Sequence, residues 1–181
     1  MDEEILHCKF VLGNNYFRYR CAAVIISEDK VLLSTKDRGF TYAAVNGAVR
    51  MGESSDKAVV REAEEITGMK LETVRPLCIV ENFFSGGGSL TGLECHELET
   101  YYLLRPAERL KSFDSFNAAT GEGMARLCWL PLSELDNYEI CPDVLKKLVK
   151  DPSHGFDIFI NDRINERTYF VNEQDSKNDI R

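Results

Sequence analysis

Acidic side chains gather in one short stretch of the chain, residues 53–65. Glu53 precedes the run REAEE at positions 61–65, and glycines flank the stretch at positions 47 and 68. In a helix, at about 100° per residue, Glu62 and Glu65 lie on nearly the same face, whereas Glu64 points well away from it. Mg²⁺ prefers a few carboxylate oxygens together with retained waters and substrate phosphates. The spacing therefore predicts a helix that presents two carboxylates to a divalent cation.

A helix must position these carboxylates, and the flanking residues supply its two ends. Ser54 or Ser55 suits the N-cap, the helix is expected to run to about Thr67, and Gly68 suits the left-handed residue that follows. The apolar stripe that packs the helix down consists of Val59, Ala63 and Ile66. Taken alone, a charged stripe that ends in glycine is also typical of a solvated helix face.

The complete pattern is more restrictive than the helix face. It has six fixed residues: Gly47, Glu53, Arg61, Glu62, Glu65 and Gly68. Each is about one residue in fifteen by composition, so a chance match is of order one in ten million per start position. An ordinary solvated helix does not explain that spacing.

The stretch Gly47–Met69 resembles the Nudix box of the Nudix hydrolases, G-x5-E-x7-R-E-U-x-E-E-x-G-U, in which U is a bulky aliphatic residue. Ala63 is a small residue at the first U position. Ile66 departs from the box, because it stands where the family has the second glutamate of its EE pair. The two residues before the box depart as well, since Val45 and Asn46 replace the first two residues of the common Pro-Gly-Gly opening.

The resemblance implies an α/β fold, an α/β/α sandwich with a mixed β-sheet, and hydrolysis of a nucleoside diphosphate linked to another group. It implies Mg²⁺ or Mn²⁺ as the cofactor. By position, Glu62 and Glu65 correspond to metal ligands, and Glu62 also orients or deprotonates water. The carbonyl of Asn46 is expected to reach the metal, and the backbone of the loop at Gly47 to lie near the phosphates.

The resemblance also assigns supporting roles. Arg61 is expected to hold the carboxylates through a charge-assisted bond, and Glu53 to fix the loop. A purely structural pair between Arg61 and Glu53 is an equal alternative. For the carboxylate missing at Ile66, three acidic residues are candidate replacements or general bases, unless they are solvated surface charges: Glu97, Glu99 and Glu122.

Aromatic residues provide candidates for stacking on a substrate base. They are Phe40, Tyr42, Phe83 and Phe84, for which core packing is the alternative. The glycine-rich segment 85–92, SGGGSLTG, is expected to be a hairpin tip that either folds over a substrate or is a simple turn.

Composition limits the class of protein. The 181 residues carry a net charge of −8, which disfavours duplex nucleic acid as a partner and is compatible with a small anionic substrate. No apolar run approaches the roughly 18 residues of a membrane span, and the acidic start MDEEIL is unlike a signal peptide. Six scattered cysteines without zinc spacing favour reduced thiols in a cytoplasmic protein. A homodimer is a further expectation, because members of the family are often dimers.

Strand and helix patterns favour one domain in residues 1–150. Residues 17–26 and 31–34 predict a hairpin, residues 71–84 and 95–104 a long strand pair, and residues 126–130 a further strand. Residues 111–125 are expected to be a polar loop, and residues 142–149 an amphipathic helix with proline in its first turn. Residues 151–181 are expected to form an extension with a terminal hairpin (156–160 and 168–171) and a polar tail from Glu173.

These observations favour a metal-dependent pyrophosphohydrolase acting on a nucleotide-type substrate. The alternative from another class is a catalytically impaired Nudix-fold module that binds a nucleotide or a partner protein, with Ile66 marking the lost ligand. Isomerisation of an isopentenyl-diphosphate type is a remote third hypothesis, for which the chain shows no matching Cys/Glu arrangement.

Overall fold

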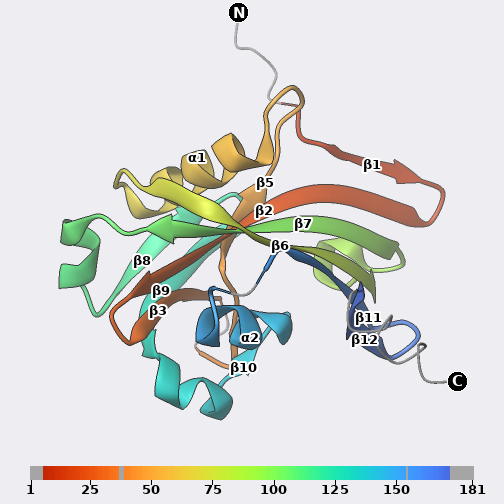
Figure 1. The fold of residues 1–181 in the computed structure, drawn as a ribbon. Helices are drawn as coiled ribbons and strands as arrows, with labels where there is room; N and C mark the ends of the chain where they lie inside the picture. Colours follow the sequence, from red (N-terminus) through yellow and green to blue (C-terminus); the bar gives the residue numbers. More distant parts are fainter. Residues whose placement is uncertain (1–5, 37–38, 154, 172–181) are drawn as a thin grey trace, which may run out of the picture.

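The computed structural model describes residues 6–36, 39–153 and 155–171. Within those ranges a large mixed sheet is covered by one α-helix on each face (Figure 1). The helices are α1 (Ser55–Thr67) and α2 (Val144–Lys150). The strands are β1 (Lys9–Leu12), β2 (Asn15–Ser27), β3 (Lys30–Thr35), β4 (Thr41–Tyr42), β5 (Val45–Ala48), β6 (Glu72–Ser85), β7 (Glu94–Arg105), β8 (Ser115–Thr120), β9 (Gly123–Pro131), β10 (Glu139–Ile140), β11 (Asp157–Asp162) and β12 (Arg167–Phe170). Three short 3-10 helices lie between strands: Gly88–Leu90, Glu108–Ser112 and Leu132–Asn137.

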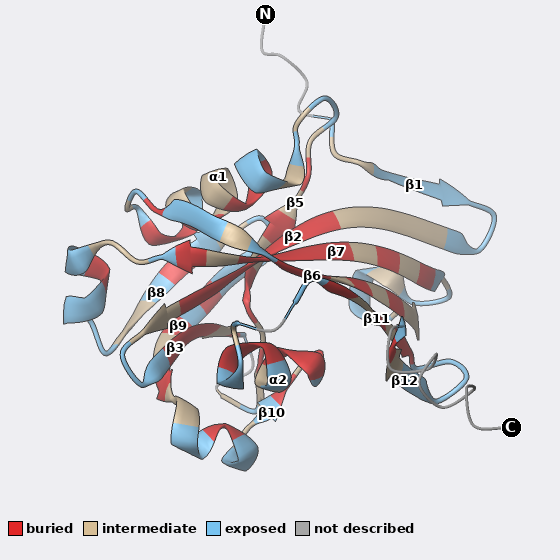
Figure 2. Cartoon of the chain, in the orientation of Figure 1, coloured by how far each residue is buried: buried red, intermediate tan, exposed pale blue. Residues whose placement is uncertain are grey.

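The long strands run through the sheet in the order β12-β11-β6-β7-β2-β3-β9-β8, and β1 and β5 also pair with β2. β2 is parallel to β7, whereas β6 and β7 form an antiparallel pair. The centres of these strands are buried, and β1 is exposed along its whole length (Figure 2). One apolar core lies between the sheet and α1 and a second lies between the sheet and α2. The predicted α/β/α sandwich with a mixed sheet is confirmed.

Helix α1 has the ends that its sequence predicts. Ser54 is the N-cap, and Gly68 follows the last turn in the left-handed conformation with φ 68°. There, Gly68 donates its N–H to the carbonyl of Glu64. The predicted apolar stripe, Val59, Ala63 and Ile66, is buried against the sheet. Because this stripe fixes the rotation of the helix, it also decides which side chains face away from the core.

The hairpin β2–β3 and the long pair β6–β7 agree with the prediction, and the pairing of β6 shifts register around Pro76. The predicted loop at 111–125 is wrong in its second half, because residues 115–120 form β8, which pairs with β9. The segment SFNAAT has little β propensity of its own, so the pairing with β9 decides its structure. The turn at Gly121 and Glu122 places a carboxylate at the tip of this hairpin.

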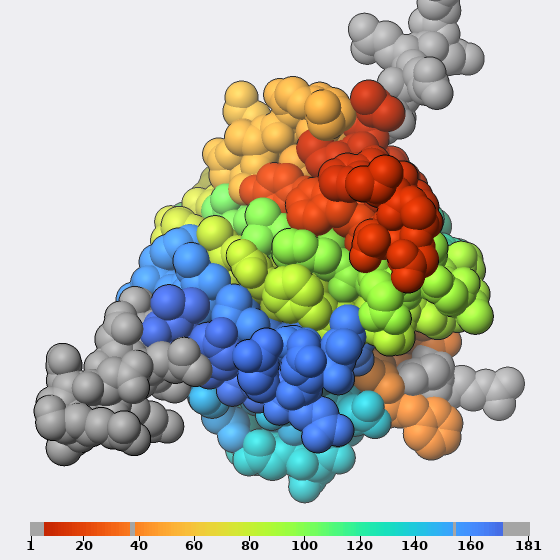
Figure 3. Space-filling model, turned by 90° about the vertical axis from the view of Figure 1, so that its right-hand side faces the viewer, coloured from red at the N-terminus to blue at the C-terminus, as the bar shows by residue number. Residues whose placement is uncertain are grey.

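The C-terminal extension continues the same sheet. β11 and β12 form the predicted hairpin, and β11 lies parallel to β6 with Asn161 opposite Asn82. Figure 3 shows these C-terminal strands in blue against the yellow-green strand β6. The predicted polar tail from Glu173 lies outside the described residues. None of the helices in the described part of the chain is long and apolar enough to cross a membrane.

Candidate active site

Arg61 ties helix α1 to the loop that precedes it. Its guanidinium donates to both carboxylate oxygens of Glu53, at 2.7 and 2.8 Å, and to the carbonyl of Ala48 at 3.0 Å. It also donates to Glu62 Oε1 at 2.7 Å. The hydrogen bond from Arg61 is the main reason that the pKa of Glu53 lies below its ordinary value. This forked arrangement holds Glu62 at a fixed distance from the loop.

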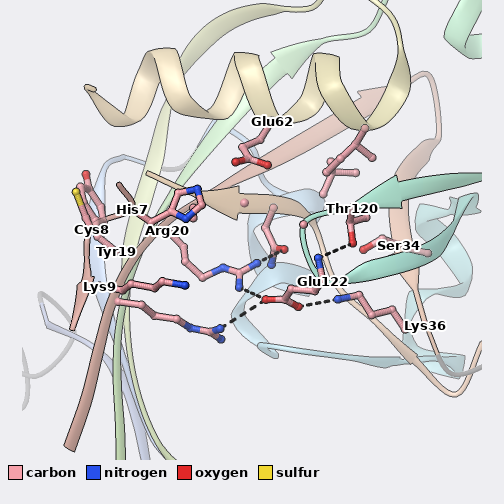
Figure 4. A pocket seen from close by; sticks show the side chains of 18 of the residues that line it. His7, Cys8, Lys9, Tyr19, Arg20, Ser34, Lys36, Glu62, Thr120 and Glu122 are labelled. Atoms are coloured by element: carbon pink, nitrogen blue, oxygen red, sulfur yellow. Dashed lines mark hydrogen bonds and ion pairs between the residues drawn. The ribbon is translucent and has the colours of Figure 1, made fainter. Parts of the chain in front are cut away.

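Glu62 lies directly over the backbone of Gly47. A Cβ atom at position 47 would be 2.0 Å from Glu62 Cδ and 2.1 Å from its Oε2. The missing side chain of Gly47 therefore makes the room that Glu62 occupies. In this position the side chain of Glu62 extends from helix α1 into a pocket of about 170 Å³ (Figure 4).

The structure does not bring Glu65 into the pocket that Glu62 lines. Glu65 is half exposed and accepts a hydrogen bond from Arg50 at 3.3 Å. Ile66, one turn after Glu62, lines the pocket instead and is 8% exposed. The pocket side of the helix thus carries one carboxylate and one apolar side chain.

Basic side chains form the other side of the pocket. Arg20 donates to Glu122 at 2.5 Å and to the side-chain oxygen of Asn46 at 2.6 Å. Lys36 donates to Glu122 at 2.6 Å, and Arg18 lies 3.6 Å from the same carboxylate (Figure 4). Burial opposes ionisation of Glu122, but the charge of Arg20 and the hydrogen bond from Lys36 outweigh it and lower its pKa to about 2. We refer to Arg18, Arg20 and Lys36 as the basic cluster.

Two further carboxylates lie deeper, on β7. Glu99 accepts hydrogen bonds from Tyr101 at 2.7 Å and from Asn46 at 3.2 Å, and burial together with the charge of Glu97 raises its pKa to about 7. Glu97 forms an ion pair with Arg18. Both line a second, larger cavity rather than the pocket of Glu62. Of the three candidate replacements for the missing carboxylate, Glu122 therefore shares the pocket with Glu62, and it is held by the basic cluster.

The donor set determines what kind of metal site the residues can make. In the described ranges, no three His, Cys, Asp or Glu side chains gather to hold an ion. Magnesium in proteins is often bound by one or two carboxylates plus substrate phosphates, without a cage made by protein alone. The residues around Glu62 fit a cation shared with phosphates, and they do not fit a complete protein cage.

The predicted aromatic residues are spread over several places. Phe83 stacks on His96 with 4.4 Å between ring centroids and lines neither cavity, and Phe40 is 76% exposed. Phe84 and Tyr42 line the larger cavity.

The basic cluster was not predicted from the sequence. The signal was present in residues 17–20, FRYR, because Arg18 and Arg20 alternate along a strand and so share one face. Lys36 directly follows β3 and is brought to them by pairing within the sheet, which no local pattern shows.

Known proteins resemble this chain in sequence pattern and in fold. A family model described as NUDIX domain matches residues 17–151. No curated protein sequence matches the chain. Among solved structures, a MutT protein from Bacillus halodurans has 18% identity and a TM-score of 0.61, covering 86% of this chain and 98% of its own. An ADP-ribose pyrophosphatase from Streptococcus suis has 17% identity and a TM-score of 0.53, with 80% and 98% covered. A NUDIX hydrolase from Nitrosomonas europaea has 15% identity and a TM-score of 0.55, with 81% and 79% covered.

At these sequence identities, the similarity to solved structures supports the fold alone. The family model spans most of the chain, including the helix that carries Glu62 and the strands that carry the basic cluster. The chain therefore belongs to the Nudix family, whose members include pyrophosphohydrolases and generally use divalent metals.

Proposed function

We propose that this protein hydrolyses the pyrophosphate bond of a nucleoside diphosphate linked to a second group, with Mg²⁺ or Mn²⁺ as the cation. One observation carries the proposal: the Glu62 carboxylate and the basic cluster line the same pocket. A pyrophosphate brings negative charge that cations must neutralise, and its cleavage by water produces a proton that a base must accept. Both requirements are met by side chains on opposite sides of this pocket.

The basic cluster would bind the phosphates. Two guanidiniums and one ammonium already surround the carboxylate of Glu122, whose oxygens stand where anionic oxygens are best stabilised. Glu122 is half exposed at the tip of a hairpin, so a phosphate can take its place when the tip moves aside. Guanidiniums suit this role because their fork of N–H groups matches phosphate oxygens.

Glu62 would act on the water. In hydrolysis, the oxygen of water forms a bond to one phosphorus, and the bond from that phosphorus to the bridging oxygen breaks. Glu62 would take the proton from the attacking water, and the leaving phosphate would carry away the electron pair of the broken bond. A positioned base of this kind contributes about 10²- to 10⁴-fold to a rate. Arg61 would position Glu62, because it holds one oxygen and leaves the other for water.

A divalent cation, when bound, would neutralise charge on the phosphates and make an attached water more acidic. Glu62 would hold it together with the phosphates, and Glu65 could join after leaving Arg50. The carbonyl of Asn46 stays a proposed ligand, supported by its place directly before Gly47 in the pocket lining.

The test is a panel of nucleotides incubated with Mg²⁺ or Mn²⁺, followed by chromatography of the products. The Streptococcus suis neighbour is named as an ADP-ribose pyrophosphatase, so ADP-ribose is the first substrate to try. Glu62→Gln should lose at least about a hundredfold in kcat/KM. Glu64→Gln is the matched control, since Glu64 lies on the same helix, lines neither cavity and should tolerate the change. Equal activity of the two variants would refute the role of Glu62.

We also propose a cytoplasmic location. The support is that all six cysteines are free, including fully buried Cys21 and Cys78, whose pKa burial raises to about 12. Cell fractionation checks it, and recovery in an oxidising compartment would contradict it.

A further inference from the structure

A second cavity, of about 360 Å³, adjoins the pocket of Glu62. The two meet at the basic cluster and Glu122, which line both. The larger cavity is in the size range of small-molecule sites, which begins at about 300 Å³. A substrate whose phosphates lie between the basic cluster and Glu62 would therefore extend the group on its terminal phosphate into this cavity.

The C-terminal extension builds part of the wall. Asn161 and Arg163 line the cavity and come from β11 and the turn after it, beyond the region that matches the family model. β11 reaches this position by pairing with β6, which puts Asn161 beside Asn82. These contributions are specific to this chain's extension.

A chain of hydrogen bonds fixes how the two amides point. Asn82 donates to Glu97 at 2.9 Å, and since a carboxylate only accepts, the carbonyl of Asn82 must face the other way. That carbonyl accepts from the amide nitrogen of Asn161 at 2.7 Å. The carbonyl oxygen of Asn161 then accepts no hydrogen bond from any described residue, although the side chain is only 8% exposed. This oxygen is not fully buried and opens on the cavity that Asn161 lines, where a hydroxyl of a ligand or a water can donate to it.

The chemistry of the lining favours hydroxyl groups over a flat base. Glu97 and Glu99 can accept hydrogen bonds from hydroxyls, and the amides can both donate and accept. The ring of Phe84 already has Arg163 at 5.0 Å and Arg18 at 5.9 Å from its centroid, so guanidiniums occupy its surroundings. A sugar ring carries several hydroxyls that both donate and accept, which matches such a lining.

We propose that the second cavity binds a sugar attached to the terminal phosphate of the substrate, and that Asn161 determines specificity for it. This inference rests on the proposed function, in which the basic cluster binds the phosphates. It identifies the group attached to the nucleoside diphosphate as a sugar.

Binding tests this without turnover. In a Glu62→Gln background, calorimetry compares ADP-ribose with ADP and UDP-glucose with UDP. At least one sugar-bearing ligand should bind about tenfold or more tightly than its parent diphosphate. Asn161→Ala should weaken that ligand by about three- to tenfold, the usual effect of one hydrogen bond, and leave the parent diphosphate unchanged. Asn117→Ala, an exposed amide on β8, is the matched control and should change neither.

Equal affinities within both pairs would overturn the proposal even if Asn161→Ala failed to fold. Equal weakening of sugar-bearing and parent ligands, or no weakening of either, would overturn the role of Asn161. A sugar preference in binding without any cleavage by the unaltered protein would leave this inference standing and refute the hydrolase instead.

Discussion

Gly47→Ala is a small change whose effect can be worked out from the site. The added Cβ would lie 2.0 Å from Glu62 Cδ, whereas ordinary contact begins at 3.4 Å, so the carboxylate must move by about 1.4 Å. A displacement of about 1 Å at a reacting group can cost about a hundredfold in rate. We therefore expect kcat/KM to fall at least about a hundredfold, equivalent to about 2.7 kcal/mol of transition-state stabilisation.

The loss of stability should be smaller than the loss of activity. Gly47 in β5 is not at a positive φ, so alanine can adopt its backbone, and the atoms in conflict belong to the end of a flexible side chain. Overpacking costs about 1–3 kcal/mol, and we expect a value near the lower end. The assays are steady-state kinetics and urea unfolding on the same preparations.

The double variant Gly47→Ala/Glu62→Ala separates the two effects. Removing the carboxylate removes the clash, so stability should rise above that of Gly47→Ala, while activity stays lost. If Gly47→Ala alone keeps the turnover of the unaltered protein, or if Glu62→Ala restores no stability in the double variant, the added Cβ does not displace the Glu62 carboxylate.

Three further predictions address the neighbouring charges. Ile66→Glu adds a carboxylate one turn from Glu62, so calorimetry should show Mn²⁺ bound about tenfold more tightly, and unchanged affinity would contradict the idea of a missing ligand. The pKa of Glu122 is lowered to about 2, so its contribution to stability is present above the unfolded value of about 4.5 and is lost as pH falls toward 2. Urea midpoints between pH 5 and 3 should thus fall less for Glu122→Gln than for the unaltered protein, and parallel curves would count against this. Arg61→Lys keeps the charge but not the fork to Glu53, so urea unfolding should show a loss of about 1–2 kcal/mol, and a neutral result would mean that the fork is not structural.

Much of the fold could be predicted from the sequence because its signals are local. The cap at Ser54, the left-handed Gly68 and the apolar stripe of α1 are set by neighbouring residues. The long strands β6 and β7 and the terminal hairpin follow from apolar patterning in the same way. β8 could not be predicted, since its residues form a strand only through pairing with β9.

The residue types of the site could be predicted from the sequence, but the orientations of their side chains were harder to predict. Arg61 donates hydrogen bonds to Glu53 and Glu62, as the resemblance to the Nudix box implies. Helical spacing also puts Glu65 near Glu62, and both carboxylates contact Nη1 of Arg61, but Glu65 pairs with Arg50 of the preceding loop as well and does not line the pocket. Such competition depends on where the loop lies.

The basic cluster and the second cavity were harder still. They require strands β2, β3, β6 and β11 to meet, and the order of strands in the sheet is not written in any one segment. Asn161 is an example, since its hydrogen-bond partner Asn82 lies 79 positions earlier in the chain.

Hydrolysis in ¹⁸O-labelled water shows directly whether this protein cleaves a pyrophosphate bond with water and whether Glu62 is the base. With a nucleoside diphosphate sugar and Mg²⁺ or Mn²⁺, mass spectrometry should find a nucleoside monophosphate and a sugar phosphate, one of which carries a single ¹⁸O atom. The same reaction with Glu62→Gln should yield almost none of either product. Intact substrate with the unaltered protein across the whole panel would contradict the proposed hydrolysis. The same labelled products at the same rate from Glu62→Gln would contradict the role of Glu62.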